Sequence, residues 1–279
     1  MRPCLNLTTV LRADLEEAVG AAAQAGFETV ELWVDALERY LNTHTVEDLR
    51  SLLDGHHMSV LGIGDIESVT FCNPEQFDAL RRRCERLASV ASAISCPTLV
   101  ANASVKPREV DISGIASETT SVLGKLLDIV EPAGVGLAFA FRGFGWCAVN
   151  SLEQAREAVE FHAGRRIGLA LDTFDLHTTG VQPGTLKSVD PSLILVMRLS
   201  DCNDAPPLVL SETDRVLPGE GIANLEAMLD ALQDAGFSGP VSLKILSPNL
   251  WSLGAAEITK VVMAVATQYL PRMRSEEKS

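Results

Sequence analysis

No uninterrupted apolar stretch in the sequence approaches the about 20 residues that cross a bilayer. The N-terminus, MRPCLNLTT, lacks the basic segment and the apolar segment of a secretory signal. The six cysteines form no CxxC pair and are too sparse for a disulfide scaffold, which is typical of reduced thiols. We therefore expect a cytoplasmic protein that has no membrane partner.

Positive charge is also in short supply. The 279 residues carry a formal net charge of -14, so a phosphate backbone or an anionic membrane would be repelled over most of the surface. The sequence also has no low-complexity tract and no linker that would divide it. These absences argue against a nucleic-acid partner and favour one domain, residues 1–270, followed by a charged tail, residues 271–279, that we expect to be disordered.

What the sequence does contain is an alternation of short apolar runs with segments of helical periodicity. Eight runs are expected to be strands: PCLNL from Pro3, TVELW from Thr29, SVLGI from Ser59, PTLVA from Pro97, VGLAFAF from Val135, IGLALD from Ile167, LILVMRL from Leu193 and VSLKIL from Val241. Strands that are apolar on both faces and alternate with helices predict an α/β fold, a single (β/α)8 TIM barrel. An open doubly wound sheet is the alternative, but NLTTVLRADL, after the first strand, lacks the glycine-rich turn of a nucleotide-binding fold.

Glycine and serine mark several helix boundaries. AGF at Ala25 and Ala235, and AGV at Ala133, place glycine where a helix is expected to end before a strand. Ser151, followed by Glu153 and Gln154, predicts an N-terminal cap for the helix after it.

The search for chemistry concentrates on the C-terminal ends of the strands, because these line the active-site mouth of a TIM barrel. Polar and aromatic side chains occur at six of these ends and in the loop DRVLPGEG. They are Asn6 on the first strand, Glu31 and Trp33 on the second, Arg142 on the fifth, Asp172, Asp175 and His177 after the sixth, Arg198 and Asp201 on the seventh, Arg215 and Glu220 in the loop, and Lys244 on the eighth.

The runs GLAFAFRGFGWCAVNSLEQA, GLALDTFDLH, MRLSD, DRVLPGEG and VSLKILSP, in this order, resemble the sugar phosphate isomerase/epimerase family of xylose isomerase-like barrels, in particular its inosose isomerase members. The resemblance covers almost the whole chain. It implies one divalent metal, bound by a glutamate, an aspartate, a histidine and a glutamate on strands five to eight. The matching positions here are Ala140, Asp172, Arg198 and Lys244, so only the aspartate is kept.

These substitutions change the charge expected at the site. Three carboxylates and a divalent cation sum to about -1, whereas Asp172, Arg198 and Lys244 sum to about +1 when all are ionised. Arginine does not serve as a metal ligand, and a charged lysine repels a cation. We therefore expect no metal and no other cofactor. Lys244 is expected to pair with Asp172, because an isolated ammonium in an apolar barrel would cost several kcal/mol.

Three hypotheses about function follow. In the first, the chain is a metal-independent isomerase, epimerase, lyase or dehydratase that abstracts a proton next to a carbonyl, with Lys244, Asp172 and Arg198 as catalytic residues. Lys244 would act as a fixed cation, as a base or as a Schiff-base nucleophile. In the second, the same three residues are a structural salt bridge in a barrel that binds a small molecule without chemistry. In the third, a metal enters through Asp172, Asp175, His177 and Asp201.

The substrate expected under the first hypothesis is a small carbonyl compound: a cyclic polyol, a keto-sugar or a secondary metabolite. It could be anionic, since Arg198 can bind a carboxylate or phosphate through its planar fork. The remaining residues near the mouth are candidates for binding it: Arg215, Arg142, Asp175, His177, Asp201, Trp33, Trp146 and Glu31. The loop that carries Phe144 and Trp146 is equally suited to a lid or to the contact of a homodimer.

Overall fold

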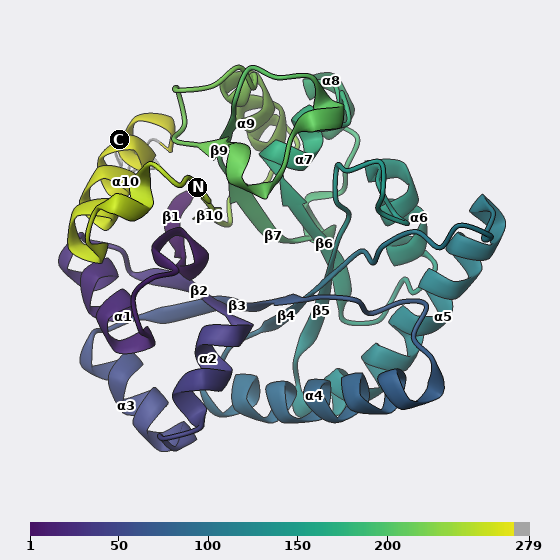
Figure 1. Cartoon of the computed structure of the whole chain (residues 1–279), viewed down its shortest axis with the longest axis horizontal. Helices are drawn as coiled ribbons and strands as arrows, with labels where there is room; N and C mark the ends of the chain where they lie inside the picture. Colours follow the sequence, from purple (N-terminus) through teal and green to yellow (C-terminus); the bar gives the residue numbers. More distant parts are fainter. Residues whose placement is uncertain (271–279) are drawn as a thin grey trace, which may run out of the picture.

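A computed structural model describes residues 1–270 of the chain, and the disorder expected for residues 271–279 lies outside the described part. Eight parallel strands close into a barrel, with helices packed around its outside (Figure 1). The order of the strands around the barrel is β1-β10-β7-β6-β5-β4-β3-β2. The closed barrel confirms the predicted (β/α)8 fold and excludes the open doubly wound sheet.

All eight predicted strands are present, but β3 and β10 end at other residues than predicted, which affects the mouth of the barrel. The barrel strands are β1 (Arg2–Asn6), β2 (Thr29–Trp33), β3 (Ser59–Ile66), β4 (Thr98–Asn102), β5 (Gly136–Ala140), β6 (Ile167–Asp172), β7 (Ile194–Leu199) and β10 (Pro240–Leu243). β3 continues past the predicted SVLGI run and carries Asp65 at the mouth. β10 ends at Leu243, so Lys244 follows the strand, where its N–H donates to the carbonyl of Leu199 on the neighbouring strand.

The helices form the outer layer of the barrel. Their bounds are α1 (Leu15–Gln24), α2 (Val34–Leu41), α3 (Val46–Gly55), α4 (Pro74–Ala93), α5 (Ile112–Val130), α6 (Leu152–Glu160), α7 (Thr173–Thr178), α8 (Pro183–Leu186), α9 (Leu225–Asp234) and α10 (Ala255–Tyr269). Gly26 and Gly236 follow the ends of α1 and α9 with φ of 93° and 98°, a backbone conformation that a side chain disfavours. Ser151 accepts from the N–H of Gln154 and caps α6, as predicted.

Alternate strand residues face two separate apolar clusters. The larger cluster lies between the strands and the helices and includes Leu137 and Phe139 of β5. The smaller one includes Ala138 and Ala140 of the same strand, together with residues of β1, β3, β4, β6 and β7. Because side chains alternate across a strand, the smaller cluster is the inside of the barrel. Ala140 therefore faces the barrel interior, at the end of β5.

The longest connection at the mouth runs from β7 to α9. It contains the 3-10 turn η5 (Glu212–Asp214) and an antiparallel pair, β8 (Asp201–Cys202) and β9 (Arg215–Val216). The Asp201 carboxylate accepts hydrogen bonds from the backbone N–H groups of Gly219 and Ala223, so it organises this connection. In residues 1–270, every helix is too short or too polar to cross a membrane.

Candidate active site

Four cationic side chains are buried where the strands end: Arg142, Arg198, Arg215 and Lys244. Burial of an unpaired charge costs several kcal/mol, so each of these groups needs a carboxylate partner. The structure provides one or more for each, in two separate hydrogen-bonded networks.

The first network joins Lys244 to Arg198 through a carboxylate that the sequence pattern did not single out. Lys244 Nζ donates to Asp65 Oδ2 at 2.8 Å, and Arg198 Nη2 donates to Asp65 Oδ1 at 2.5 Å. Arg198 also forms a buried ion pair with Glu31, in which Nε donates to Oε1 at 3.0 Å. Asn6 and Ser242 donate to the other oxygen of Glu31. Asp65 is thus held by two cations, and Glu31 is held by one cation and two neutral donors.

The charges in this network decide the protonation of Asp65. Burial alone would raise its pKa, but the cations of Arg198 and Lys244 outweigh that penalty and hold the pKa well below its usual range. Burial would lower the pKa of Arg198, because it disfavours the charged form. The carboxylates of Asp65 and Glu31 outweigh burial and hold this pKa well above its usual range. Asp65 is therefore a carboxylate at neutral pH, and it faces two cations at once.

The second network is centred on Arg215, which is completely buried. Its Nη1 donates to Asp172 Oδ1 at 2.6 Å, its Nε to Glu212 Oε2 at 3.0 Å, and its Nη2 lies 3.4 Å from Asp175 Oδ2. The guanidinium also stacks 4.3 Å above the ring of Phe174. Three carboxylates and an aromatic ring contact this guanidinium, so Arg215 links β9, β6 and α7. Few of its N–H groups remain to bind a substrate.

Asp175 differs from the other carboxylates of the site in its proton affinity. Burial and the neighbouring Asp172 raise its pKa to about 6, against the opposing charges of Arg215 and Arg142. Its Oδ1 accepts from the backbone N–H of Gly143 at 2.7 Å. Asp175 therefore gains or loses its proton close to neutral pH, as an internal group of the second network.

Arg142 connects the wall of the barrel to the long β7–α9 connection. Its Nη2 forms an ion pair with Glu212, and its Nη1 lies 3.4 Å from Glu67 Oε1. Asn102, the last residue of β4, donates to the same Glu67 oxygen at 2.8 Å. Burial works to raise the pKa of Glu212, but Arg215 and Arg142 hold that pKa below its usual range. Glu212 thus remains ionised between two arginines.

A cleft of about 370 Å³ opens between these networks at the mouth. Its lining is mostly polar and charged: Thr8, Leu11, Trp33, Asp35, Asp65, Glu67, Arg83, Arg142, Glu212, Lys244 and Leu246. This volume is within the range of small-molecule sites. The cleft lies where the catalytic residues of TIM barrels are found.

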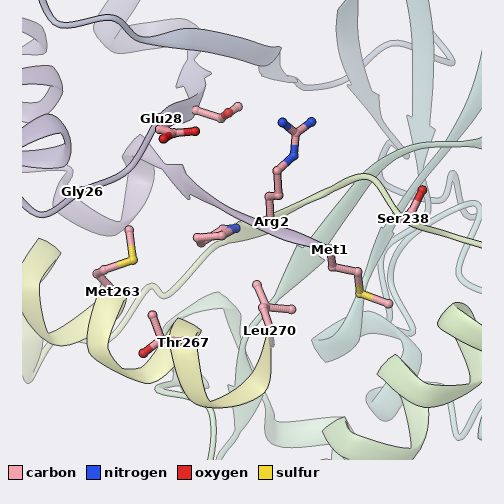
Figure 2. A pocket seen from close by; sticks show the side chains of 10 residues that line it. Met1, Arg2, Gly26, Glu28, Ser238, Met263, Thr267 and Leu270 are labelled. Carbon is pink, nitrogen blue, oxygen red and sulfur yellow. The ribbon is translucent and has the colours of Figure 1, made fainter. Parts of the chain in front are cut away.

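A larger cavity, of about 910 Å³, lies at the opposite end of the barrel. Figure 2 shows Arg2 at the start of β1, Glu28 before β2, and Met263 and Thr267 of α10 around it. Arg2, Glu28 and Thr267 are exposed, and all four buried cations of the site lie elsewhere. The charged cleft is therefore the better candidate for an active site.

The predicted site residues fall into three groups. Lys244, Arg142 and Trp33 line the cleft. Beneath it lie Arg198, Asp172, Arg215, Asp175 and Glu31, which are buried in the two networks. Three residues lie apart: Asp201 holds a loop, Trp146 is 55% exposed and stacks on Phe144, and His177 is a partly buried residue of α7.

One predicted pairing is wrong. Lys244 pairs with Asp65, not with Asp172, whose cationic partner is Arg215. Asp172 also accepts from the N–H of Phe174 and caps α7, which turns its Oδ1 toward the helix and the β9 arginine. The excess positive charge expected from Asp172, Arg198 and Lys244 is cancelled, because Glu31 and Asp65 lie in the same network.

Three functional candidates were missed from the sequence: Asp65, Glu67 and Glu212. The run GDI follows the predicted strand SVLGI and contains an acidic residue, so Asp65 could have been found by extending that strand. Glu67 is the first residue after β3. Glu212 sits in a 3-10 turn within a connection of irregular structure, where no periodic signal points to it.

The donor set does not suit a divalent metal. At the four matching positions the structure has an alanine, a carboxylate paired with Arg215, a guanidinium and an ammonium. Among residues 1–270, there is no group of three or more histidine, cysteine, aspartate or glutamate side chains that could hold a metal ion. The alternative set of Asp172, Asp175, His177 and Asp201 is not brought together, because Asp201 is turned toward the backbone of its own loop.

Comparison with known proteins gives consistent matches over the whole barrel. The family described as "Xylose isomerase-like TIM barrel" matches residues 19–265. An inosose isomerase of Halalkalibacterium halodurans is 31% identical over 264 residues, which cover 93% of each chain. A 3-dehydroshikimate dehydratase of Pseudomonas aeruginosa is 25% identical over 247 residues, which cover 86% of this chain and 37% of that protein. A crystal structure described as the IolI protein with a binding zinc atom superposes with a TM-score of 0.92 at 28% identity, and covers 98% of this chain and all of that one.

Proposed function

Because the chain belongs to the xylose isomerase-like TIM barrel family, we propose that it isomerises, epimerises or dehydrates a small hydroxylated carbonyl compound without a divalent metal at the family's metal position. The isomerases and dehydratases among its relatives support the coarser assignment, an isomerase or lyase that acts on a small molecule. The observation that carries the finer proposal is the Lys244 ammonium, held 2.8 Å from Asp65 in the wall of the mouth cleft.

The step that we propose is a proton transfer at the carbon next to the carbonyl. A base removes this proton, the C–H electron pair forms the enolate double bond, and negative charge develops on the carbonyl oxygen. A fixed cation in a water-poor site stabilises such a charge without reorganisation. Lys244 is the cleft cation suited to this role, because Asp65 and, beneath it, Arg198 hold it in place. Return of the proton to the opposite face of the same carbon completes an epimerisation. Its return to the former carbonyl carbon, with transfer of the neighbouring hydroxyl proton to the enolate oxygen, completes an isomerisation. Departure of a β-hydroxyl together with the abstracted proton, as water, completes a dehydration.

Glu67 is the carboxylate that we assign as the proton acceptor. It lines the same cleft, and its side chain is 56% exposed. Asn102 and Arg142 both contact its Oε1, which fixes the direction of the carboxylate. Asp65 is less suited to the task, since two cations lower its pKa and so weaken it as a base.

The charge pattern of the cleft favours a neutral substrate over an anionic one. Each cation in the lining has a carboxylate partner: Lys244 has Asp65, Arg142 has Glu212, and Arg83 has Glu38. An anionic substrate would have to displace one of these partners. A neutral polyol or keto-sugar needs only hydrogen bonds, which paired charges still donate and accept.

Solvent deuterium incorporation tests the proposal even when the product is not identified. The intact protein is incubated in D₂O with a panel of neutral cyclic polyol ketones and keto-sugars, and exchange at the carbon next to the carbonyl is followed by NMR. We expect exchange with at least one of them, and Lys244→Met should slow it roughly a hundredfold or more. Lys187→Met is the matched control, because Lys187 is an exposed lysine that pairs with Asp234.

Two results would count against this mechanism. Exchange by Lys244→Met at the wild-type rate, together with a large loss of stability, would identify the Lys244, Asp65 and Arg198 network as a structural salt bridge. In a second experiment, the protein is treated with borohydride in the presence of a ketone that it turns over. A covalent adduct on Lys244 would identify this residue as a Schiff-base nucleophile. The proposed fixed cation predicts no adduct.

A further inference from the structure

The mouth cleft adjoins a second cavity, which lies over the loop between β3 and α4. This cavity has a volume of about 470 Å³, and Glu67 and Arg83 line both it and the cleft. Glu67 is the first residue after β3, and Arg83 is on α4, where its guanidinium donates to the carboxylate of Glu38 on α2. Because the two cavities share these side chains, a ligand in the cleft can extend past Glu67 into the second cavity, which we call the β3–α4 groove.

The β3–α4 groove differs from the cleft in the character of its lining. Its apolar wall is formed by Phe71, Cys72, Ala79, Leu80 and Val105. The charged side chains of its lining are the two that it shares with the cleft, whereas Lys244 and Arg142 line the cleft alone. Val105 is 62% exposed at the edge of this wall. The groove therefore suits an apolar group better than a charged one.

The wall of the groove is preformed. Ser68 and Phe71 have positive φ angles, 56° and 59°, which residues other than glycine rarely adopt. Neighbouring elements hold this conformation: the N–H of Thr70 donates to Ser104 Oγ at 2.9 Å, and the N–H of Phe71 donates to Glu118 Oε1 at 3.2 Å. A strained backbone persists where its surroundings fix it, so the loop keeps one shape. A surface that is already ordered lowers the entropic cost of binding.

We propose that the β3–α4 groove is a subsite for an apolar substituent of the substrate. The assignment rests on the function proposed above, in which Glu67 takes a proton and Lys244 faces the carbonyl oxygen. Lys244 lines the cleft but not the groove, whereas Glu67 lies between the two. The carbonyl oxygen thus points away from the groove, and the substituent is attached to the carbon that loses its proton. The substrate class is an α-hydroxy ketone with an alkyl or aryl group on its hydroxylated carbon.

The size of the groove and the polarity of its wall both favour such a substituent. The groove is larger than the cleft, about 470 Å³ against about 370 Å³, so a compound that fills only the cleft leaves water on the apolar wall. An apolar group that displaces this water gains free energy in proportion to the apolar area that it covers. A polyol chain in the same place would lose hydrogen bonds to water without replacing them.

A homologous series of ketones tests the subsite by binding and does not need turnover. The intact protein is titrated calorimetrically with 3-hydroxybutan-2-one, 3-hydroxyhexan-2-one and 3-hydroxyoctan-2-one, which differ in the length of the chain on the hydroxylated carbon. A methylene group that is half-buried in an open groove gains about twofold in affinity. We therefore expect the octanone to bind about 15-fold more tightly than the butanone.

Two variants change the groove, and a third is the matched control. Val105→Asp places a charge on the exposed edge of the apolar wall, and Ala79→Trp fills the groove from an exposed position of α4. Either variant should reduce the ratio of the two affinities from about 15 to about 3 or less. Val209→Asp should leave this ratio unchanged, because Val209 is 68% exposed but lies outside both linings.

Three results would overturn the subsite. The first is equal affinity along the series, and the second is a ratio that Val105→Asp and Ala79→Trp both leave at the wild-type value. The third is equal affinity along the series together with dissociation of a dimer by Val105→Asp, which would identify the groove as a contact between two copies of the chain.

Deuterium exchange with the same ketones separates the subsite from the proposed function. A wild type that gains affinity along the series but exchanges a proton of none of its members would refute the proposed proton transfer and leave the subsite standing. Exchange with the butanone, without a gain in affinity along the series, would refute the subsite alone.

Discussion

The two ends of the barrel differ in the volume of their cavities and in the number of charged side chains that are buried there. The N-terminal end has the larger hollow, about 910 Å³, but its charged side chains, Arg2 and Glu28, are exposed to solvent. The C-terminal end has a cleft of about 370 Å³ above four buried cations and their carboxylates. Buried ion pairs seldom stabilise a fold more than apolar packing would, so their concentration at one end indicates a functional role. Volume alone would have selected the end opposite to the one that the buried charges select.

The largest predicted contrast between the two ends is the cost of removing one arginine. Arg215→Met leaves Asp172, Asp175 and Glu212 without their common cation in a buried place, so we expect a loss of about 3–5 kcal/mol in the free energy of unfolding. Arg2→Met at the N-terminal end should change it by less than about 0.5 kcal/mol. Urea denaturation of both variants measures the difference, and similar losses would remove the distinction between the ends.

A smaller change in the free energy of unfolding is expected when the pH changes, because of Asp175 at the C-terminal end. Asp175 keeps its proton up to a pH of about 6 in the folded protein, whereas an unfolded aspartate loses it near about 4. Between these values the folded state binds more protons, so this group makes the protein less stable as the pH rises. The amide of Asp175→Asn does not titrate. The free energy of unfolding of this variant, relative to that of the wild type, should therefore rise by about 1–3 kcal/mol from pH 4 to pH 7.

Melting temperatures of the two proteins, recorded in parallel across this pH range, check the prediction for Asp175. A difference that stays constant with pH would mean that Asp175 is ionised throughout. Such a result would also weaken the description of the second network, in which Asp172 lies beside Asp175 and Arg215, Arg142 and Glu212 surround them.

The smallest predicted contrast concerns space and not charge. Leu246→Trp narrows the mouth cleft and should lower the rate of deuterium exchange about tenfold, through substrate positioning. Thr267→Trp partly fills the N-terminal cavity and should leave the rate unchanged. Exchange kinetics on one substrate compare the two variants, and a loss of rate in Thr267→Trp alone would reverse the assignment of the ends.

The fold was predictable because its determinants are local. Strands that are buried on both faces have continuous apolar runs, which can be read from the sequence. Gly26 and Gly236 end helices because glycine readily adopts the positive φ that these positions need. The burial of Lys244 was predictable for the same reason, since its neighbours along the chain are apolar or small.

The partners in the site were not predictable in the same way. Asp65 and Lys244 are separated by 179 residues and meet only because β3 and β10 belong to one closed barrel and because β3 runs past its apolar segment. Glu212 reaches Arg142 and Arg215 from an irregular connection. Asp172 and Arg198 are partners in the β6–β7 register, yet their side chains form ion pairs with other residues.

Metal content tests the central claim most directly: that fixed cations now occupy the place of the family's metal. The purified protein is incubated with manganese, zinc and cobalt, desalted and subjected to elemental analysis, and its deuterium exchange is measured before and after chelation. We predict metal far below one ion per chain and exchange that chelation does not change. Near-stoichiometric metal, with exchange lost on chelation and restored by the ion, would contradict the account and return the chain to the metal-dependent isomerases.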